Sequence, residues 1–171
     1  ARALNQGLSA SMEGGATYVL LLDQDSRPTK EMFESLVGAA RRMEGSGRAV
    51  ACVAPVLRDQ KLGGEQYGPQ RSDIVGRATF ATSGTLITRL GWRQVGPMWE
   101  DLFIDGIDHE WCFRARAQGL ETVIVPDAIL MHDMGEAAVK VLGRFRPIHR
   151  SPIRHYFIIR NLLWLARRSY I

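Results

Sequence analysis

Apolar runs alternate along this chain with segments whose apolar residues recur at helical spacing. Residues 18–22 form an uninterrupted apolar run, and residues 49–56 form a second one. A run without polar alternation is typical of a strand that is buried on both faces, as in a parallel α/β sheet. Between the two runs, apolar residues on one helical face predict a helix that begins near Pro28 and ends at residues 45–47.

The remaining segments continue the alternation of helices and strands. We expect helices at residues 1–13 and 108–118, a long loop or polar hairpin at 58–74, a β-rich segment at 79–88 and a short strand at 122–125. Within the β-rich segment, Gly84 permits close approach by a ligand or a neighbouring strand. Pro126 is expected to end the last strand. The order of these elements predicts an α/β fold.

Length and composition set further bounds. The chain has 171 residues, of which 46% are hydrophobic, so it suits one domain with a real core and is not wholly disordered. Cys52 and Cys112 match no metal-binding spacing, which predicts two free, buried thiols and suits a reducing cytoplasm. No secretory signal is visible at the first residues. Because Ala1 already lies in a predicted helix, we expect the start of a domain to be missing.

Positive charge gathers near the C-terminus. Residues 137–171 contain eight Lys and Arg residues and no Asp or Glu. We therefore divide the chain into a main part, 1–136, and a basic, aromatic helical segment, 137–171. Such a segment suits an anionic membrane surface, a nucleic acid, or simple packing of a terminal helix on the main part. No apolar stretch reaches the roughly 20 residues that span a bilayer.

Two carboxylates follow the first predicted strand. Asp23 and Asp25 are separated by one residue at its carboxyl end, where ligands collect in α/β sheets. Carboxylate oxygens there suit a divalent cation and, through it, a diphosphate. Most D-x-D pairs are solvated turn residues. For a pair directly after a buried strand, a solvated turn and a site for metal or phosphate chemistry are equally good interpretations.

A second acidic group lies where the helix at 108–118 begins. Asp105, Asp108 and Glu110 fall within six residues and are separated by apolar side chains. Acids are favoured in a first helical turn by the helix dipole, so simple capping is one interpretation. The other is a partly desolvated carboxylate with a raised pKa that acts as a general base. His132 ends an apolar run and is either structural or, if the fold brings it beside Asp23 and Asp25, a cation ligand.

In their order along the chain, these motifs resemble the inverting GT-A glycosyltransferases of family 2, and within them the bacterial rhamnosyltransferases. The resemblance rests on residues 5–7, 18–26, 83–85, 95–96, 102–116, 119, 126–128 and 132. Residues 154–157 and 160–161 are similar to that group's C-terminal motif. The resemblance implies a GT-A (Rossmann-like) mixed sheet flanked by helices, incomplete at its N-terminus because the nucleotide-binding unit has no counterpart before Ala1. We therefore expect this chain alone to bind donor poorly.

The resemblance also implies roles for individual residues. Asp108 would be the catalytic base, and Asp25, His132 and Asp23 would hold Mg²⁺ or Mn²⁺ with the donor's diphosphate. The remaining matches would bind donor or acceptor: Asp23, Ser83, Gly84, Asp105, Glu110 and Trp111. Divalent-cation chemistry suits a departing diphosphate, and inversion needs one base and no covalent intermediate.

The expected function is transfer of a sugar, with L-rhamnose favoured, from a nucleotide-diphosphate donor such as dTDP-L-rhamnose. The acceptor would be a saccharide or a lipid-linked molecule at the inner face of the cytoplasmic membrane, and no nucleic-acid partner is implied. One alternative is a non-catalytic carbohydrate- or membrane-binding module on the same scaffold. The other is a phosphatase of the haloacid dehalogenase type, which Arg27 disfavours because a Thr or Val usually stands at that position.

Overall fold

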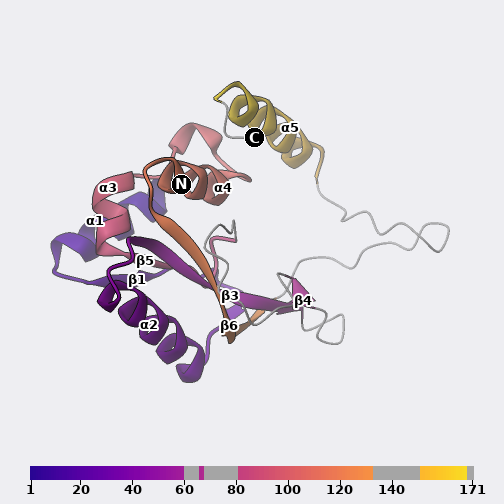
Figure 1. Ribbon diagram of the computed structural model, residues 1–171. Helices are drawn as coiled ribbons and strands as arrows, with labels where there is room; N and C mark the ends of the chain where they lie inside the picture. The colour runs from indigo at the N-terminus through magenta and orange to yellow at the C-terminus, as the bar shows by residue number, and fades with distance from the viewer. Residues whose placement is uncertain (60–65, 68–80, 133–150, 169–171) are drawn as a thin grey trace.

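The computed structural model describes residues 1–59, 66–67, 81–132 and 151–168 (Figure 1). Its helices are α1 (Arg2–Glu13), α2 (Lys30–Gly45), α3 (Arg89–Val95), the 3₁₀ turn η1 (Glu100–Leu102), α4 (Ile107–Ala117) and α5 (Pro152–Arg167). Its strands are β1 (Tyr18–Leu20), β2 (Ser26–Arg27), β3 (Val50–Asp59), β4 (Gln66–Tyr67), β5 (Leu86–Thr88) and β6 (Glu121–His132). The helices expected at 1–13, 28–47 and 108–118 are therefore confirmed.

The described strands form one mixed sheet in the order β1-β5-β3-β6-β2, with β4 beside β3. β3 and β6 are parallel, and the other strand pairs are antiparallel. Helix α2 covers one face of the sheet, and α1, α3 and α4 lie on the other (Figure 1). The α/β fold with a mixed sheet flanked by helices is thereby confirmed, and it is consistent with a GT-A, Rossmann-like fold.

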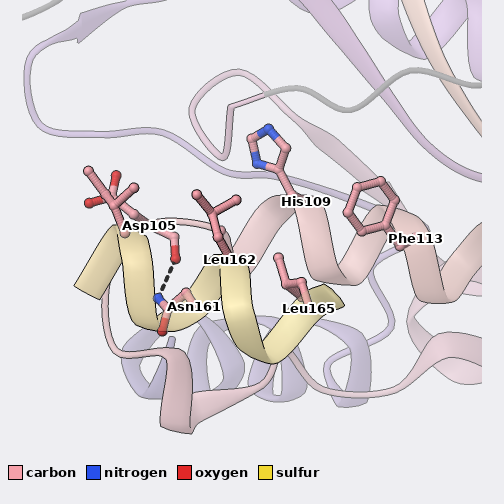
Figure 2. Close-up of a pocket in the computed structure, with 8 residues that line it drawn as sticks. Asp105, His109, Phe113, Asn161, Leu162 and Leu165 are labelled. Atoms are coloured by element: carbon pink, nitrogen blue, oxygen red, sulfur yellow. Dashed lines mark hydrogen bonds between the residues drawn. The ribbon is translucent and has the colours of Figure 1, made fainter. Parts of the chain in front are cut away.

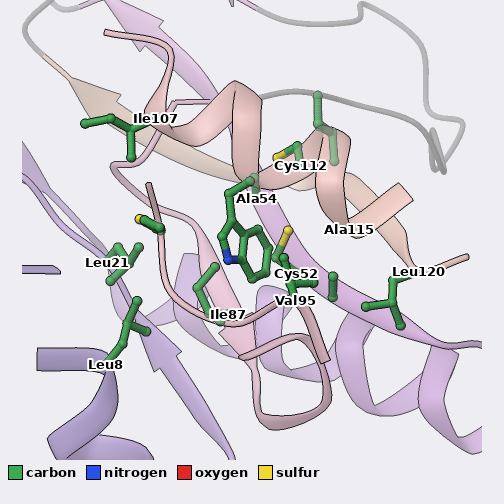
Figure 3. Packing of buried hydrophobic residues seen from close by; sticks show 14 of the residues in the cluster. Leu8, Leu21, Cys52, Ala54, Ile87, Val95, Ile107, Cys112, Ala115 and Leu120 are labelled. Atoms are coloured by element: carbon green, nitrogen blue, oxygen red, sulfur yellow. The ribbon is translucent and has the colours of Figure 1, made fainter. Parts of the chain in front are cut away.

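Two apolar cores fill the space between the sheet and its helices. On one face, α2 packs Met32, Leu36 and Met43 against Val53 and Val123. On the other face, α1, α3 and α4 surround a larger core (Figure 3). Neighbouring strand residues such as Leu86 and Ile87 enter different cores, as the two-residue period of a pleated strand requires. In β3, Ala51 and Cys52 both enter the larger core, at the register shift between Val50 and Cys52.

Cys52 and Cys112 both lie in the larger core (Figure 3). Both are free thiols, as the sequence predicts. Burial, followed by the hydrogen bond with Cys112, raises the pKa of the Cys52 thiol well above its usual value. The two cysteines are therefore part of the apolar packing and are poor candidates for nucleophilic chemistry.

The first strand differs from its expectation. β1 covers Tyr18–Leu20, is only partly buried and pairs antiparallel with β5. Leu22 is 41% exposed, so the prediction that residues 18–22 form a strand buried on both faces is wrong. The reason is the position of β1 at the edge of the sheet, where β5 is its one neighbour among the described strands.

The last strand is longer than predicted. β6 continues through Pro126 to His132, because the ladder with β3 shifts register between Pro55 and Val56. Opposite this shift, the partner changes from Val125 to Ile129, so the proline lies in an irregularity of the ladder. Proline is tolerated at such a bulge because no regular ladder hydrogen bond is required there. The prediction that Pro126 ends the strand is therefore wrong.

The segment expected as a loop or polar hairpin at 58–74 contains β4, which pairs antiparallel with the end of β3. The other residues from 60 to 74 lie outside the described residues. Of the basic segment, residues 133–150 and 169–171 also lie outside them. The described part of this segment is α5, which packs Leu165 and Trp164 towards the main part of the chain. Packing of a terminal helix is thus one of its roles.

Candidate active site

The segment that follows β1 is tied to the segment that precedes β5. The Asp23 backbone N–H donates to Ser83 Oγ at 3.1 Å, and Ser26 Oγ lies 2.5 Å from the same oxygen. The Gly84 N–H donates to the Leu21 carbonyl at 2.7 Å. The D-x-D segment and the Ser83–Gly84 pair therefore form one hydrogen-bonded unit.

Gly84 has no room for a side chain. Its φ is 83°, and a Cβ there would lie 2.6 Å from Pro55 Cγ and 2.8 Å from Leu130 Cδ2. The close approach predicted at Gly84 is therefore made by neighbouring strands β3 and β6. This packing places Ser83, which is 1% exposed, between the ends of β1 and β2.

Asp108 contacts the other end of the same segment. Its Oδ2 accepts a hydrogen bond from the Thr82 backbone N–H at 3.1 Å. Its Oδ1 accepts from the His109 N–H at 2.9 Å and lies 2.9 Å from His109 Nδ1. Asp108 is in the first turn of α4, where free backbone N–H groups and the dipole favour a carboxylate. Its side chain is 21% exposed, so it remains accessible to a substrate.

The carboxylate of Asp108 changes the pKa of the neighbouring His109 ring. The hydrogen bond with Asp108 is the largest of the effects that raise the pKa of His109 above its usual value, and burial opposes it. The His109 backbone N–H donates to Asp108 Oδ1 whatever the charge of the ring, and a protonated ring holds the same oxygen through Nδ1 as well.

The backbone of His132 lies at the D-x-D segment. β2 and β6 pair so that His132 is opposite Ser26, the residue that follows Asp25. The side chain of His132 lies outside the described residues. The antiparallel pairing therefore brings the backbone of His132 beside the segment that carries Asp23 and Asp25, as predicted. The role of His132 as a metal ligand stays a prediction.

The donor set at this place fits a hard divalent cation. Asp23 and Asp25 are both exposed, and carboxylate oxygens suit Mg²⁺ or Mn²⁺. Among the side chains that the structure describes, no group of three or more His, Cys, Asp or Glu residues is arranged to hold a metal ion. A cation site here would need His132, substrate oxygens or water as further ligands.

Asp105 lies on a strained loop that α5 holds. Its φ is 60°, and that of Phe103 is 62°, values that non-glycine residues adopt at a cost of about 1–3 kcal/mol. Arg154 Nε and Nη2 donate to the two Asp105 carboxylate oxygens at 2.7 and 3.0 Å. This hydrogen bond is the largest of the effects on the pKa of the Arg154 guanidinium, and it raises that pKa above its usual value.

Glu110 and Trp111 lie on the inner side of α4. Each is 1% exposed. Arg114 Nε and Nη2 donate to the Glu110 carboxylate at 2.9 Å each, and Trp111 Nε1 donates to the Gly96 carbonyl at 2.9 Å. Their described contacts are thus with the protein interior. The role in acceptor binding that the resemblance implies for them stays a prediction.

A pocket of about 300 Å³ lies between α4 and α5 (Figure 2). Asp105 and His109 lie at its polar side, and Phe113, Leu162 and Leu165 contribute apolar surface. Concave, mostly apolar sites with a few polar groups are typical of ligand pockets. This one is next to the Asp105–Asp108 segment.

Local sequence patterns gave no role to two groups that shape the site. Thr82 donates to Asp108 from 26 positions away. From the sequence, a role was predicted for its neighbour Ser83 but none for Thr82. Arg154 and Asn161 belong to the C-terminal motif named above, but the sequence alone assigned neither a contact.

The described mixed sheet and the helices that flank it define the class as an α/β protein consistent with the GT-A fold. Over its whole length, the chain is similar to a protein of Shigella flexneri named dTDP-rhamnosyl transferase RfbF, with 32% identity across 188 aligned positions. The chain spans 60% of that protein's length. No family model matches the chain. The similarity supports the resemblance to rhamnosyltransferases drawn from the sequence.

Proposed function

We propose that the protein containing this chain is a glycosyltransferase that moves a sugar, with L-rhamnose favoured, from a nucleotide-diphosphate donor such as dTDP-L-rhamnose. The observation that carries the proposal is the short segment Thr82–Ser83, which bonds the D-x-D segment on one side and the Asp108 carboxylate on the other. Because one dipeptide ties both segments, the arrangement supports the proposal that donor and acceptor groups lie close together. The similarity to a dTDP-rhamnosyl transferase supports the choice of donor.

Asp23, Asp25 and His132 are the proposed ligands of Mg²⁺ or Mn²⁺. A divalent cation there would stabilise the negative charge of a departing nucleoside diphosphate. The backbone of the segment is held by the hydrogen bonds to Ser83, so the two carboxylates would be oriented before the donor binds. Such preorganisation lowers the cost of binding.

Asp108 is the proposed general base. Oδ1 or Oδ2 would take the proton from the acceptor hydroxyl as its oxygen attacks the anomeric carbon, and the bond to the diphosphate would break on the opposite face. The configuration at that carbon would invert. The Thr82 and His109 contacts orient the carboxylate for this step.

The proposal is tested by donor consumption. Because the chain spans 60% of its relative, the assay uses the full-length protein that contains it, with dTDP-L-rhamnose, a saccharide acceptor, and Mg²⁺ or Mn²⁺. We expect Asp25→Ala to lose metal-stimulated turnover by about 10²-fold or more, since a bound cation contributes several kcal/mol to stabilising the leaving charge. Glu34→Gln, on an exposed part of α2, serves as the control and should keep the wild-type metal response. If the wild type consumes no nucleotide sugar, the binding-module alternative becomes the better one.

We further propose that α5 contacts an anionic membrane surface. Its solvent-exposed apolar residues outside the pocket are Ile153, Tyr156, Ile159 and Leu163, each exposed by more than half. The helix carries three arginines and no acid, which suits anionic headgroups. Within the described residues, no helix is long and apolar enough to cross a membrane.

Vesicle sedimentation tests the membrane contact. We expect the full-length protein to sediment with phosphatidylglycerol vesicles, and Ile159→Ser with Leu163→Ser to weaken binding at least tenfold, because each lost apolar contact costs about 1.5 kcal/mol. Leu90→Ser, an exposed leucine on α3, is the matched control. Equal binding of the double variant and the control would contradict the proposal.

A further inference from the structure

The loop between η1 and α4 has an unfavourable backbone. Phe103, Asp105 and Gly106 all have positive φ, at 62°, 60° and 83°. Two of the three are not glycine, so the loop needs contacts elsewhere to hold it in this conformation. The loop leads directly into the first turn of α4, which carries Asp108.

Asn161 of α5 bonds three carbonyls of this loop region. Its Nδ2 donates to the carbonyls of Leu102, Ile104 and Asp105 at 2.9, 2.8 and 2.7 Å. Figure 2 shows the Asn161 side chain directed at the Asp105 carbonyl. The side chain is buried, with 2% of the residue exposed. A buried amide that serves three carbonyls of one loop fixes the path of that loop, because each unmade bond would be costly.

Two arginines of the same helix complete these contacts. Arg160 Nη2 donates to the carbonyls of Asp101 and Leu102 at 2.7 and 3.1 Å, and it also donates to Asn161 Oδ1 at 2.8 Å. Arg154 binds the Asp105 carboxylate through two nitrogens. The planar guanidinium fork matches a carboxylate in orientation as well as charge.

We propose that Asn161, Arg160 and Arg154 form a clamp on α5 that positions the loop 102–106, and with it Asp105 and the first turn of α4. The three side chains are positioning residues, because they act through the loop. The catalytic consequence rests on the proposed function of Asp105 and Asp108. The site would be complete only when α5 is docked on the main part of the chain. Docking of α5 would therefore affect the chemistry at the acceptor more than it affects donor binding.

The clamp is tested in the full-length protein with Asn161→Asp and Arg154→Lys. Asn161→Asp keeps the size of the side chain but removes both N–H donors, and Arg154→Lys keeps the charge but removes the fork. Arg167→Lys is the matched control, since Arg167 is exposed on the same helix. Backbone amide exchange at residues 103–110 should become at least tenfold faster in both variants and stay unchanged in the control. Unchanged exchange at 103–110 in Arg154→Lys, with the fold intact, would overturn the clamp even if Asn161→Asp fails to fold.

Steady-state kinetics separate positioning from general support of the fold. With dTDP-L-rhamnose and a saccharide acceptor, Arg154→Lys should lower kcat at least tenfold and raise the acceptor KM, while the donor KM stays within twofold. Equal changes in both KM values would show a merely structural role and overturn the proposal. If the wild-type protein consumes no donor, the proposed function fails, and amide exchange still decides whether the clamp exists.

Discussion

Asp108→Asn in the full-length protein is expected to lower turnover by about 10³-fold while donor binding is mostly retained, since removal of a general base costs about 10²–10⁴-fold. The substitution is nearly isosteric, and an asparagine Oδ1 can still accept the Thr82 N–H that Asp108 accepts at 3.1 Å. The change therefore removes the capacity to take a proton more than it alters the geometry. Turnover is followed as release of the nucleoside diphosphate, and donor binding by titration calorimetry.

A structural readout accompanies that kinetic result. Because Asp108 is the main cause of the raised pKa of His109, Asp108→Asn should lower the pKa of His109 towards its usual value, as an NMR titration of the ring would show. Glu34→Gln on α2 is the control for loss of one surface carboxylate. If the His109 pKa falls while turnover stays within threefold of the wild type, Asp108 is not the base and the binding-module interpretation gains support.

Local pattern predicted the helices α1, α2 and α4 well, but it missed α3 (Arg89–Val95) and did not show which strands pair. The helices at residues 2–13 and 107–117 end near glycines that the sequence shows directly. The edge position of β1 and the passage of β6 through Pro126 depend instead on which strands lie alongside. Register is a property of two segments that are far apart in sequence, so no periodicity within one segment reveals it.

The candidate site shows the same division between local and distant signals. Asp23 and Asp108 were identifiable from acids placed next to apolar segments, and the structure links them through Thr82 and Ser83. The Asn161 contacts join residues 56–59 positions apart and have no local signature. Glu110 illustrates a third case, because an acid in a first helical turn suggests a solvated cap. The structure instead pairs this acid with Arg114, four residues later on the same helix.

Arg114→Met is expected to lower the free energy of unfolding by about 3–5 kcal/mol, because it leaves a buried charge without its partner. The Glu110 side chain is 1% exposed, and Arg114 is its bidentate partner. Arg114 also donates to the carbonyls of Val95 and Pro97 at 2.6 and 2.8 Å, so three groups lose a donor at once. Urea unfolding of the full-length protein, followed by tryptophan fluorescence, measures the loss.

Two further variants determine what Glu110 does. Arg93→Met, at an exposed arginine of α3, should change stability by less than about 0.5 kcal/mol. Glu110→Leu combined with Arg114→Met removes both charges and should recover most of the loss, because replacing a buried ion pair by apolar residues is often neutral. A loss below about 1 kcal/mol in Arg114→Met would contradict a supporting role for the pair. If the double variant regains stability but its acceptor KM rises more than tenfold with donor KM unchanged, Glu110 acts on the acceptor as the sequence resemblance implies; if both KM values are retained, its role is to anchor α4 to residues 95–97.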